Sequence, residues 1–157
     1  MSMRVPRRRT FRLPELVAAG SVPPDMAAII ERIVAARLSF LVTGGTGSGK
    51  TTLLSCLLGL VDPAQRIVIV EDSAELRPEH PHVVRLEARA ANLEGAGAVT
   101  MTRLVREALR MRPDRLIVGE VRGPECADLL MALNIGHEGG CRLTAGLAVA
   151  GGGMLRW

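Results

Sequence analysis

The sequence predicts an α/β protein whose sheet is mostly parallel and flanked by helices. Three apolar runs, at residues 38–43, 66–72 and 115–120, have the near-continuous pattern of strands that are buried on both faces. Segments with helical spacing of apolar residues separate these runs, as they do in βαβ units. The first run leads into a glycine-rich loop, and the other two end in acids. Because parallel strands end at one edge of a sheet, we expect a site along that edge.

The composition fits a single globular domain with an aliphatic core. The chain has 157 residues, of which 48% are hydrophobic and 2% are aromatic. Cys56, Cys126 and Cys141 form no C-x-x-C pair, and Cys56 lies on the apolar side of an expected helix. We therefore expect a buried, reduced thiol in a cytoplasmic protein. The basic start lacks the apolar core of a signal peptide, and no apolar stretch is long enough to span a bilayer.

Residues 1–23 are expected to form a basic linker or arm. Five arginines precede the first acid, Glu15, and they are Arg4, Arg7, Arg8, Arg9 and Arg12. Such an arm is either a solvated linker or a contact for nucleic acid or anionic lipid, and we favour the linker. No aromatic side chains interleave with a basic face, so we expect no specific nucleic-acid recognition.

The first half of the chain alternates helices and strands. A helix is predicted over Pro24–Arg37, where apolar residues recur at helical spacing and a proline occupies the first turn. It leads into a buried strand at Leu38–Thr43. A helix at Lys50–Leu60 follows, with its leucines inward, and Arg66–Asp72 suits a central strand.

The second half continues this alternation. His82–Leu86 is expected to be a short strand. Thr100–Met111 has the pattern of a helix, with Thr100 or Thr102 as its N-cap. Arg115–Glu120 is a third buried strand, and a further helix is expected at Pro124–Asn134.

The glycine-rich loop predicts a phosphate-binding site. Residues 44–51 fit the pattern G-x-x-x-x-G-K-[ST], after a strand and before a helix. Glycines let backbone N–H groups turn inward as a nest for an anion, Lys50 adds a mobile charge, and Thr51 offers a hydroxyl to Mg²⁺. The alternative is a glycine-rich turn without a ligand. The predicted nucleotide-binding residues are Gly44, Gly45, Thr46, Gly47, Ser48, Gly49, Lys50, Thr51 and Thr52.

Acids that end two of the apolar runs are candidates for holding magnesium and for orienting an attacking water. Glu71 and Asp72 end the second run, with Glu75 three residues further on, and Glu120 ends the third. The small Gly119 is expected to leave room for a ligand beside the strand end. The alternative for each acid is a solvated side chain at a strand terminus.

In their order along the chain, these segments resemble the secretion ATPase superfamily of type II and type IV secretion and type IV pilus motors (GspE/PilT/VirB11-like). The subgroup most alike is the CpaF family, the tight-adherence (Flp) pilus assembly ATPases. The resemblance covers about residues 10–140. It is carried by residues 44–54, 69–76, 82–87, 109–115, 117–123 and 134–139.

This resemblance implies a RecA-like P-loop NTPase core that uses ATP and Mg²⁺. Glu71, Asp72 and Glu75 look like the family's Asp box, and Glu120 looks like the Walker B glutamate near the attacking water. We accordingly expect Glu120 and Glu75 to be catalytic, and Thr51, Glu71 and Asp72 to bind the metal. Arginines that reach a neighbouring nucleotide in the family fall in the region of Arg85, Arg89, Arg103, Arg110 and Arg112.

The resemblance also implies partners and a location. Full-length family members work as homo-hexameric rings that convert ATP hydrolysis into movement of pilins or secreted substrates. Inner-membrane pilus or secretion platform proteins are the implied partners. The implied location is the cytoplasm, in peripheral association with the inner face of the membrane.

The two ends depart from the family pattern. Family members carry a separate N-terminal domain, and they continue after the Gly-His-Glu-Gly turn into a Thr-x-His-Ala-Asn box. Residues 141–157 here contain no histidine and no acid. We therefore expect an ATPase core at 24–140 that is incomplete at its C terminus. The tail at 141–157 is expected to be atypical, as a frameshifted end or a genuine variant.

Two functions follow from these observations. The chain is either an ATP-hydrolysing motor subunit of a secretion or pilus assembly system, or a truncated nucleotide-binding fragment without effective turnover. A small-molecule kinase is disfavoured, because Lys50 is the only lysine of the chain and the Asp box matches the motor ATPases.

Overall fold

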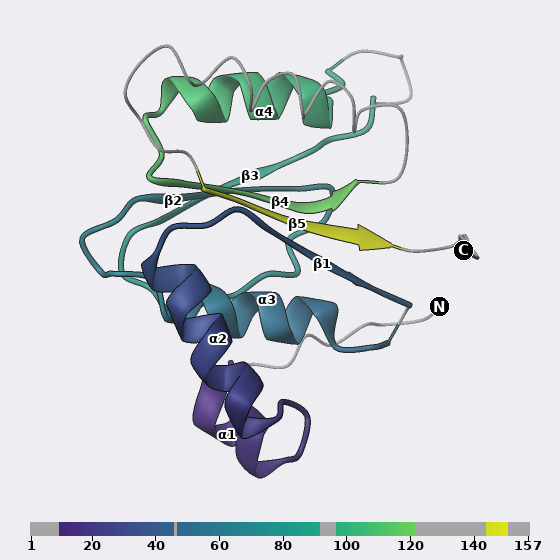
Figure 1. Cartoon of the computed structure of the whole chain (residues 1–157). Helices are drawn as coiled ribbons and strands as arrows, with labels where there is room; N and C mark the ends of the chain where they lie inside the picture. The colour runs from purple at the N-terminus through teal and green to yellow at the C-terminus, as the bar shows by residue number, and fades with distance from the viewer. Residues whose placement is uncertain (1–9, 46, 92–96, 122–143, 151–157) are drawn as a thin grey trace, which may run out of the picture.

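The fold is a five-stranded parallel sheet between two layers of helices (Figure 1). The computed structural model describes residues 10–45, 47–91, 97–121 and 144–150. The strand order is β1-β5-β4-β2-β3, and every pairing is parallel. The predicted α/β class with a mostly parallel sheet is therefore confirmed. The elements are α1 (Leu13–Ala18), α2 (Pro24–Ala35), β1 (Phe40–Gly44), α3 (Lys50–Gly59), β2 (Ile67–Glu71), β3 (Val83–Glu87), α4 (Met101–Arg110), β4 (Arg115–Val121) and β5 (Thr144–Ala150).

The two helical layers explain why the central strands are apolar on both faces. In Figure 1, α4 covers one face of the sheet, and α1, α2 and α3 lie on the other. All five residues of β2 are buried. Ile69 shares a buried cluster with Leu54 of α3, whereas Val70 shares another cluster with Val105 of α4. The alternation of side chains along the strand thus feeds two separate cores.

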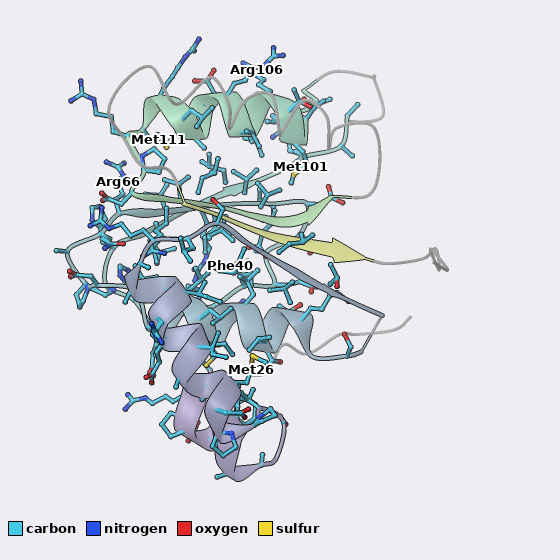
Figure 2. The ribbon with its side chains drawn as sticks, in the orientation of Figure 1. Met26, Phe40, Arg66, Met101, Arg106 and Met111 are labelled. Carbon is cyan, nitrogen blue, oxygen red and sulfur yellow. The ribbon has the colours of Figure 1, made fainter. Side chains whose placement is uncertain are left out.

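The strand β1 differs from the buried strand that the sequence predicts at residues 38–43. Leu38 is 54% exposed and Leu41 is 55% exposed. The reason is position: β1 lies at one edge of the sheet, and α4 packs against β2, β3 and β4. Phe40, on the other face, packs against the cluster of α3, and Figure 2 shows it between the sheet and the helices below.

Part of the expected N-terminal linker is packed into the fold. Leu13 and Leu16 of α1 are buried with Val22 and with Cys56 of α3 in a third apolar cluster. The buried thiol expected at Cys56 is confirmed, and its burial raises the pKa of the thiol. The sequence predicts that the core begins at residue 24. In the structure, residues before this position already belong to the packed interior.

Part of the expected tail also belongs to the sheet. Strand β5, within residues 141–157, pairs with β1 on one side and with β4 on the other. It therefore separates the strand that precedes the glycine-rich loop from the strand that carries Glu120. The helix expected at Pro124–Asn134 lies outside the described residues. Within the described ranges, no helix is long and apolar enough to cross a membrane.

Candidate functional site

The predicted site residues gather at the edge of the sheet where the parallel strands end. Strand β1 ends at Gly44, β2 at Glu71 and β3 at Glu87, and β4 ends one residue after Glu120. Helix α3 begins at Lys50, directly after the glycine-rich loop. One edge thus brings together the glycine-rich loop, predicted to bind phosphate, and several carboxylates, and it is the edge at which open α/β sheets bind ligands.

The backbone of the loop requires glycine at two positions. Gly49, the N-cap of α3, has φ of 90°, and Gly47 has φ of 78°. Both values lie in the left-handed region, where a side chain is strained. Thr46, also predicted to bind nucleotide, lies outside the described residues. The loop therefore has the conformation that its glycine pattern predicts at the described positions.

Lys50 folds back over the loop. Its Nζ donates hydrogen bonds to the carbonyl oxygens of Gly44, at 2.7 Å, and Gly45, at 2.6 Å. These neutral acceptors engage two of the three N–H groups of the ammonium, and a phosphate oxygen would accept from it more strongly because that oxygen is charged. The lysine is therefore placed to exchange loop carbonyls for phosphate oxygens. Thr51 and Thr52 follow in the first turn of α3, where backbone N–H groups have no intrahelical partners.

Glu71 is turned into the protein and holds the loop that follows β2. Its side chain is only 4% exposed. Its Oε1 accepts hydrogen bonds from the backbone N–H groups of Glu75, at 3.1 Å, and Leu76, at 2.9 Å. Burial raises the pKa of Glu71, while the N–H groups of Leu76 and Glu75 and the charge of Arg85 lower it, and the charge of Glu75 raises it. The net direction is upward.

Gly119 has a different role from the expected one. From the sequence, its small size is expected to leave room for a ligand beside the strand end. In the structure that space is filled by Glu71, because a Cβ at position 119 would lie 2.7 Å from Glu71 Cγ. Residues 71 and 119 are neighbours across the β2–β4 pairing, which aligns Val70 with Val118. Gly119 therefore makes room for a buried glutamate.

The other two acids of the expected Asp box face solvent. Asp72 and Glu75 are exposed on the loop of residues 72–76, which ends at the buried Leu76. The structure thus separates three acids that the sequence grouped together. Glu71 is inside, and Asp72 and Glu75 are outside. Glu120 lies one residue before the end of β4, so its backbone reaches the same edge.

Sequence reasoning missed Glu87 as a residue of this edge. It ends β3 and is the register partner of Glu71. Its Oε1 accepts a hydrogen bond from the backbone N–H of Ala74, at 3.4 Å. The signal was available, because Glu87 is an acid at the end of an apolar run, as Glu71 is. The predicted strand stopped one residue before it.

The arginines of the resemblance lie on β3 (Arg85), in the segment after it (Arg89), on α4 (Arg103 and Arg110) and just after α4, where Arg112 has φ of 50°. Nε of Arg89 donates to the carbonyl of Gly97, at 3.2 Å, and Nη1 of Arg110 donates to Glu107 Oε1, at 3.1 Å. Arg103 is exposed on α4. Figure 2 shows Arg106 on the face of the same helix that points away from the sheet. Action of any of these arginines on a neighbouring nucleotide stays a prediction.

The donors present fit a magnesium ion that arrives with a nucleotide. Magnesium keeps several waters and usually takes one or two carboxylates together with phosphate oxygens. Thr51 offers a hydroxyl at the start of α3, and Asp72 is an exposed carboxylate at the sheet edge. In the ranges that the structure describes, no three His, Cys, Asp or Glu side chains are grouped so as to hold a metal ion by themselves.

Comparison with known sequences gives one family match. The pattern of the family described as "Type II/IV secretion system protein" matches residues 1–151. A protein of Mycobacterium tuberculosis that is named as a conjugal transfer protein is 63% identical over 140 residues, which are 89% of this chain and 40% of the relative. VirB11 of Agrobacterium fabrum is 40% identical over 115 residues, which are 73% of this chain and 33% of the relative. The chain thus spans about 40% or less of the length of these relatives.

Solved structures show the same architecture. The VirB11 ATPase of the Brucella suis type IV secretion system, solved with sulphate, aligns with a TM-score of 0.62 and 31% identity. The alignment covers 89% of this chain and 38% of that one. The ATPase DotB of Legionella pneumophila aligns with a TM-score of 0.63 and 24% identity, over 92% of this chain and 37% of that one. This second likeness concerns the fold alone.

Proposed function

Because the chain belongs to the family of type II/IV secretion system proteins, with the fold of its ATPases, we propose that it binds Mg·ATP and forms the nucleotide site of a motor subunit. The observation that supports this best is the sheet edge itself. It combines a left-handed glycine loop, the ammonium of Lys50 held over that loop, and the exposed carboxylates of Asp72 and Glu75.

The loop and Lys50 bind the phosphates in this proposal. Backbone N–H groups of the loop and the first turn of α3 donate to phosphate oxygens. Lys50 leaves the carbonyls of Gly44 and Gly45 and pairs with the more strongly accepting phosphates. Its charge then stabilises the negative charge that develops during phosphoryl transfer.

The acids position the metal and the water. The hydroxyl of Thr51 and, directly or through water, Asp72 would hold a magnesium ion that arrives with ATP, and the ion would supply positive charge to neutralise the phosphates. Glu75 and Glu120 orient the attacking water and take up its proton. Glu71, expected as a third metal-binding residue, is turned to the backbone of the loop instead, and the proposal assigns it no metal contact.

The wider role of the chain is the movement of pilins or secreted substrates. The relatives named above are a conjugal transfer protein and VirB11 proteins, one of them from a type IV secretion system. A place among the CpaF pilus assembly ATPases rests on the motif resemblance alone and is part of this proposal. We propose a homo-hexamer at the inner face of the membrane, in contact with secretion or pilus platform proteins. The alternative is a nucleotide-binding fragment without effective turnover. The chain spans 40% of the length of the Mycobacterium tuberculosis relatives, so the activity of a whole motor protein stays a proposal for it.

Thermal unfolding with and without Mg·ATP tests the binding step. Nucleotide that binds the folded state only raises the melting temperature, by an amount that corresponds to about 2.7 kcal/mol at a hundredfold excess over Kd. We expect this rise in the wild type and in Arg106→Ala, which alters an exposed side chain on α4, and its loss in Lys50→Ala. Absence of any rise in the wild type would contradict the proposal.

Phosphate release under the same conditions decides between the two functions. Turnover that Glu120→Gln abolishes, while the nucleotide-dependent rise in melting temperature persists, supports the motor subunit. Binding without turnover supports the fragment. Turnover that survives both Lys50→Ala and Glu120→Gln would place the hydrolysis elsewhere.

A further inference from the structure

The loop at residues 72–76 is held by carboxylates from the strands on either side of it. It leaves β2, carries Asp72 and Glu75, and reaches the core again at Leu76, which is 2% exposed. Three successive N–H groups, of Ala74, Glu75 and Leu76, donate to carboxylate oxygens of Glu87 and Glu71. The loop has no helix or strand of its own, so these bonds fix its backbone.

Glu71 contributes more to this arrangement than Glu87. Its Oε1 accepts two of the three hydrogen bonds, at 3.1 and 2.9 Å, in a buried setting, whereas Glu87 is exposed and accepts one at 3.4 Å. Hydrogen bonds to a buried carboxylate are stronger than exposed ones because little water competes for the oxygen. An unpaired buried carboxyl would also be costly, so the loop and Glu71 satisfy each other.

Glu71 has little freedom to turn toward a metal. Its Cγ occupies the space beside Gly119, where even a methyl group would approach to 2.7 Å. Side chains alternate along β2, which places Glu71 on the same face as Ile69, toward the layer of α3. Of its two carboxylate oxygens, Oε1 already accepts from two backbone N–H groups, which fixes the orientation of the carboxyl group.

We propose that Glu71 is a positioning residue, whose carboxylate clamps the backbone of the 72–76 loop and so fixes Glu75 and Asp72 at the nucleotide-binding edge. The catalytic importance of this edge rests on the function proposed above. The hydrogen bonds of the clamp itself do not depend on whether the protein hydrolyses ATP. A misplacement of about 1 Å in a catalytic group lowers the rate by about a hundredfold, so a clamp on the backbone of Glu75 matters for catalysis.

The test compares Glu71→Gln with Glu71→Leu in the 157-residue chain. Glutamine keeps a carbonyl oxygen that accepts both N–H groups, and leucine keeps the bulk but accepts nothing. We expect amide hydrogen exchange at Glu75 and Leu76 to stay within about threefold of the wild type in the glutamine variant. We expect it to rise by about tenfold or more in the leucine variant, because the hydrogen bonds to a charged group are lost. The amide of Val68 in β2 reports whether the fold itself is intact.

Gly119→Ala and Glu87→Gln extend the comparison. The alanine displaces Glu71 from the space beside β4, so it should expose the same two amides while Glu71 itself is retained. Glu87→Gln alters an exposed acceptor of the neighbouring amide of Ala74 and should leave Glu75 and Leu76 protected. If leucine disrupts the whole fold, the alanine variant still tests the clamp. If Glu71→Leu or Gly119→Ala folds and its amide exchange at Glu75 and Leu76 matches the wild type, the proposal is overturned.

The dependence of nucleotide binding on Mg²⁺ separates a clamp from a metal ligand. For a clamp, the Mg²⁺ concentration that gives half-maximal binding of ATP changes by less than about threefold in Glu71→Gln, because the acceptor is retained. For a ligand, removal of the charge raises that concentration by about tenfold or more, and this result would overturn the proposal. If the wild type binds no ATP, the proposed function is wrong. The hydrogen-exchange measurements then still test whether Glu71 holds the backbone of the 72–76 loop.

Discussion

At the scale of single residues, Glu71 is 4% exposed and its carboxyl accepts hydrogen bonds from backbone N–H groups, and this burial raises its pKa above the ordinary value of 4.5. The charged groups that act on it are Arg85, which favours the ionised form, and Glu75, which disfavours it. An acid whose pKa is higher in the folded state binds its proton more readily there than in the unfolded chain. Ionised Glu71 therefore costs folding free energy at neutral pH.

This cost predicts a pH dependence with a definite sign. As pH falls through the raised pKa of Glu71 toward 4.5, protonation relieves the cost, so this residue stabilises the fold increasingly. Glu71→Gln is neutral at every pH and lacks the effect. The free energy of unfolding is measured with urea at pH 7, 6 and 5. As pH falls, the value for the wild type should rise relative to the value for Glu71→Gln. A difference that stays constant, or changes in the opposite direction, would contradict a raised pKa.

At the scale of elements, the ends of helices are fixed by individual polar side chains. The C-terminal end of α2 is tied to the sheet by Arg115 of β4, whose Nη2 donates to the carbonyl of Val34 at 2.7 Å and whose Nε donates to Gln65 at 2.8 Å. The residue Arg115 is 2% exposed, and burial lowers the pKa of its guanidinium, as does the charge of Arg37, while Asp114 raises it. The tie holds α2 beside the loop that leads into β1.

From the sequence, either Thr100 or Thr102 could be the N-cap of α4, and the structure shows which of them is. Thr100 Oγ1 accepts from the backbone N–H of Arg103 at 3.3 Å, so Thr100 is the N-cap, and Thr102 lies within the helix. Thr100→Ala should lower the free energy of unfolding by about 1 kcal/mol. Thr102→Ala should lower it less or raise it, because alanine favours the helix interior. Urea denaturation of the two variants checks this, and equal losses would count against the cap.

At the scale of the whole molecule, the position of β5 joins the two halves of the sheet. It pairs with β1 over residues 40–44 and with β4 from residue 115 onward, and no direct pairing joins β1 to β4. The glycine loop and the strand of Glu120 are thus held in one sheet through residues 144–150. A strand between two others has its backbone groups engaged on both sides, so it does not tolerate proline.

Ala148→Pro tests this role of β5. Proline removes an N–H from a central strand and should lower the melting temperature by several degrees, since each kcal/mol corresponds to about 2–4 °C in a domain of this size. The amides of β1 should exchange faster in the same variant. Ala148→Val, which suits a strand, serves as the matched control and should melt near the wild type. If both variants behave like the wild type, residues 144–150 do not hold the sheet together.

Local patterns in the sequence were enough to predict most of the elements. Helices α3 and α4 and strands β2 and β4 begin and end within two residues of their predicted limits, because apolar spacing, glycine and proline act over a few neighbouring residues. The same is true of the glycine loop, whose left-handed positions are glycines in the sequence. Its binding of ATP, and the roles expected for Glu75, Asp72 and Glu120, stay predictions.

What the sequence determined by itself is therefore the α/β class, the family resemblance and the location of a glycine-rich loop before α3. Only the tertiary structure decided that β5 lies between β1 and β4, that β1 is an edge strand with Leu41 exposed, and that Glu71 is turned inward against Gly119. The physical reason is that strand order, and the side to which a polar side chain turns, depend on residues far apart in the chain. Glu71 and Gly119 are neighbours only because β2 and β4 pair in one register.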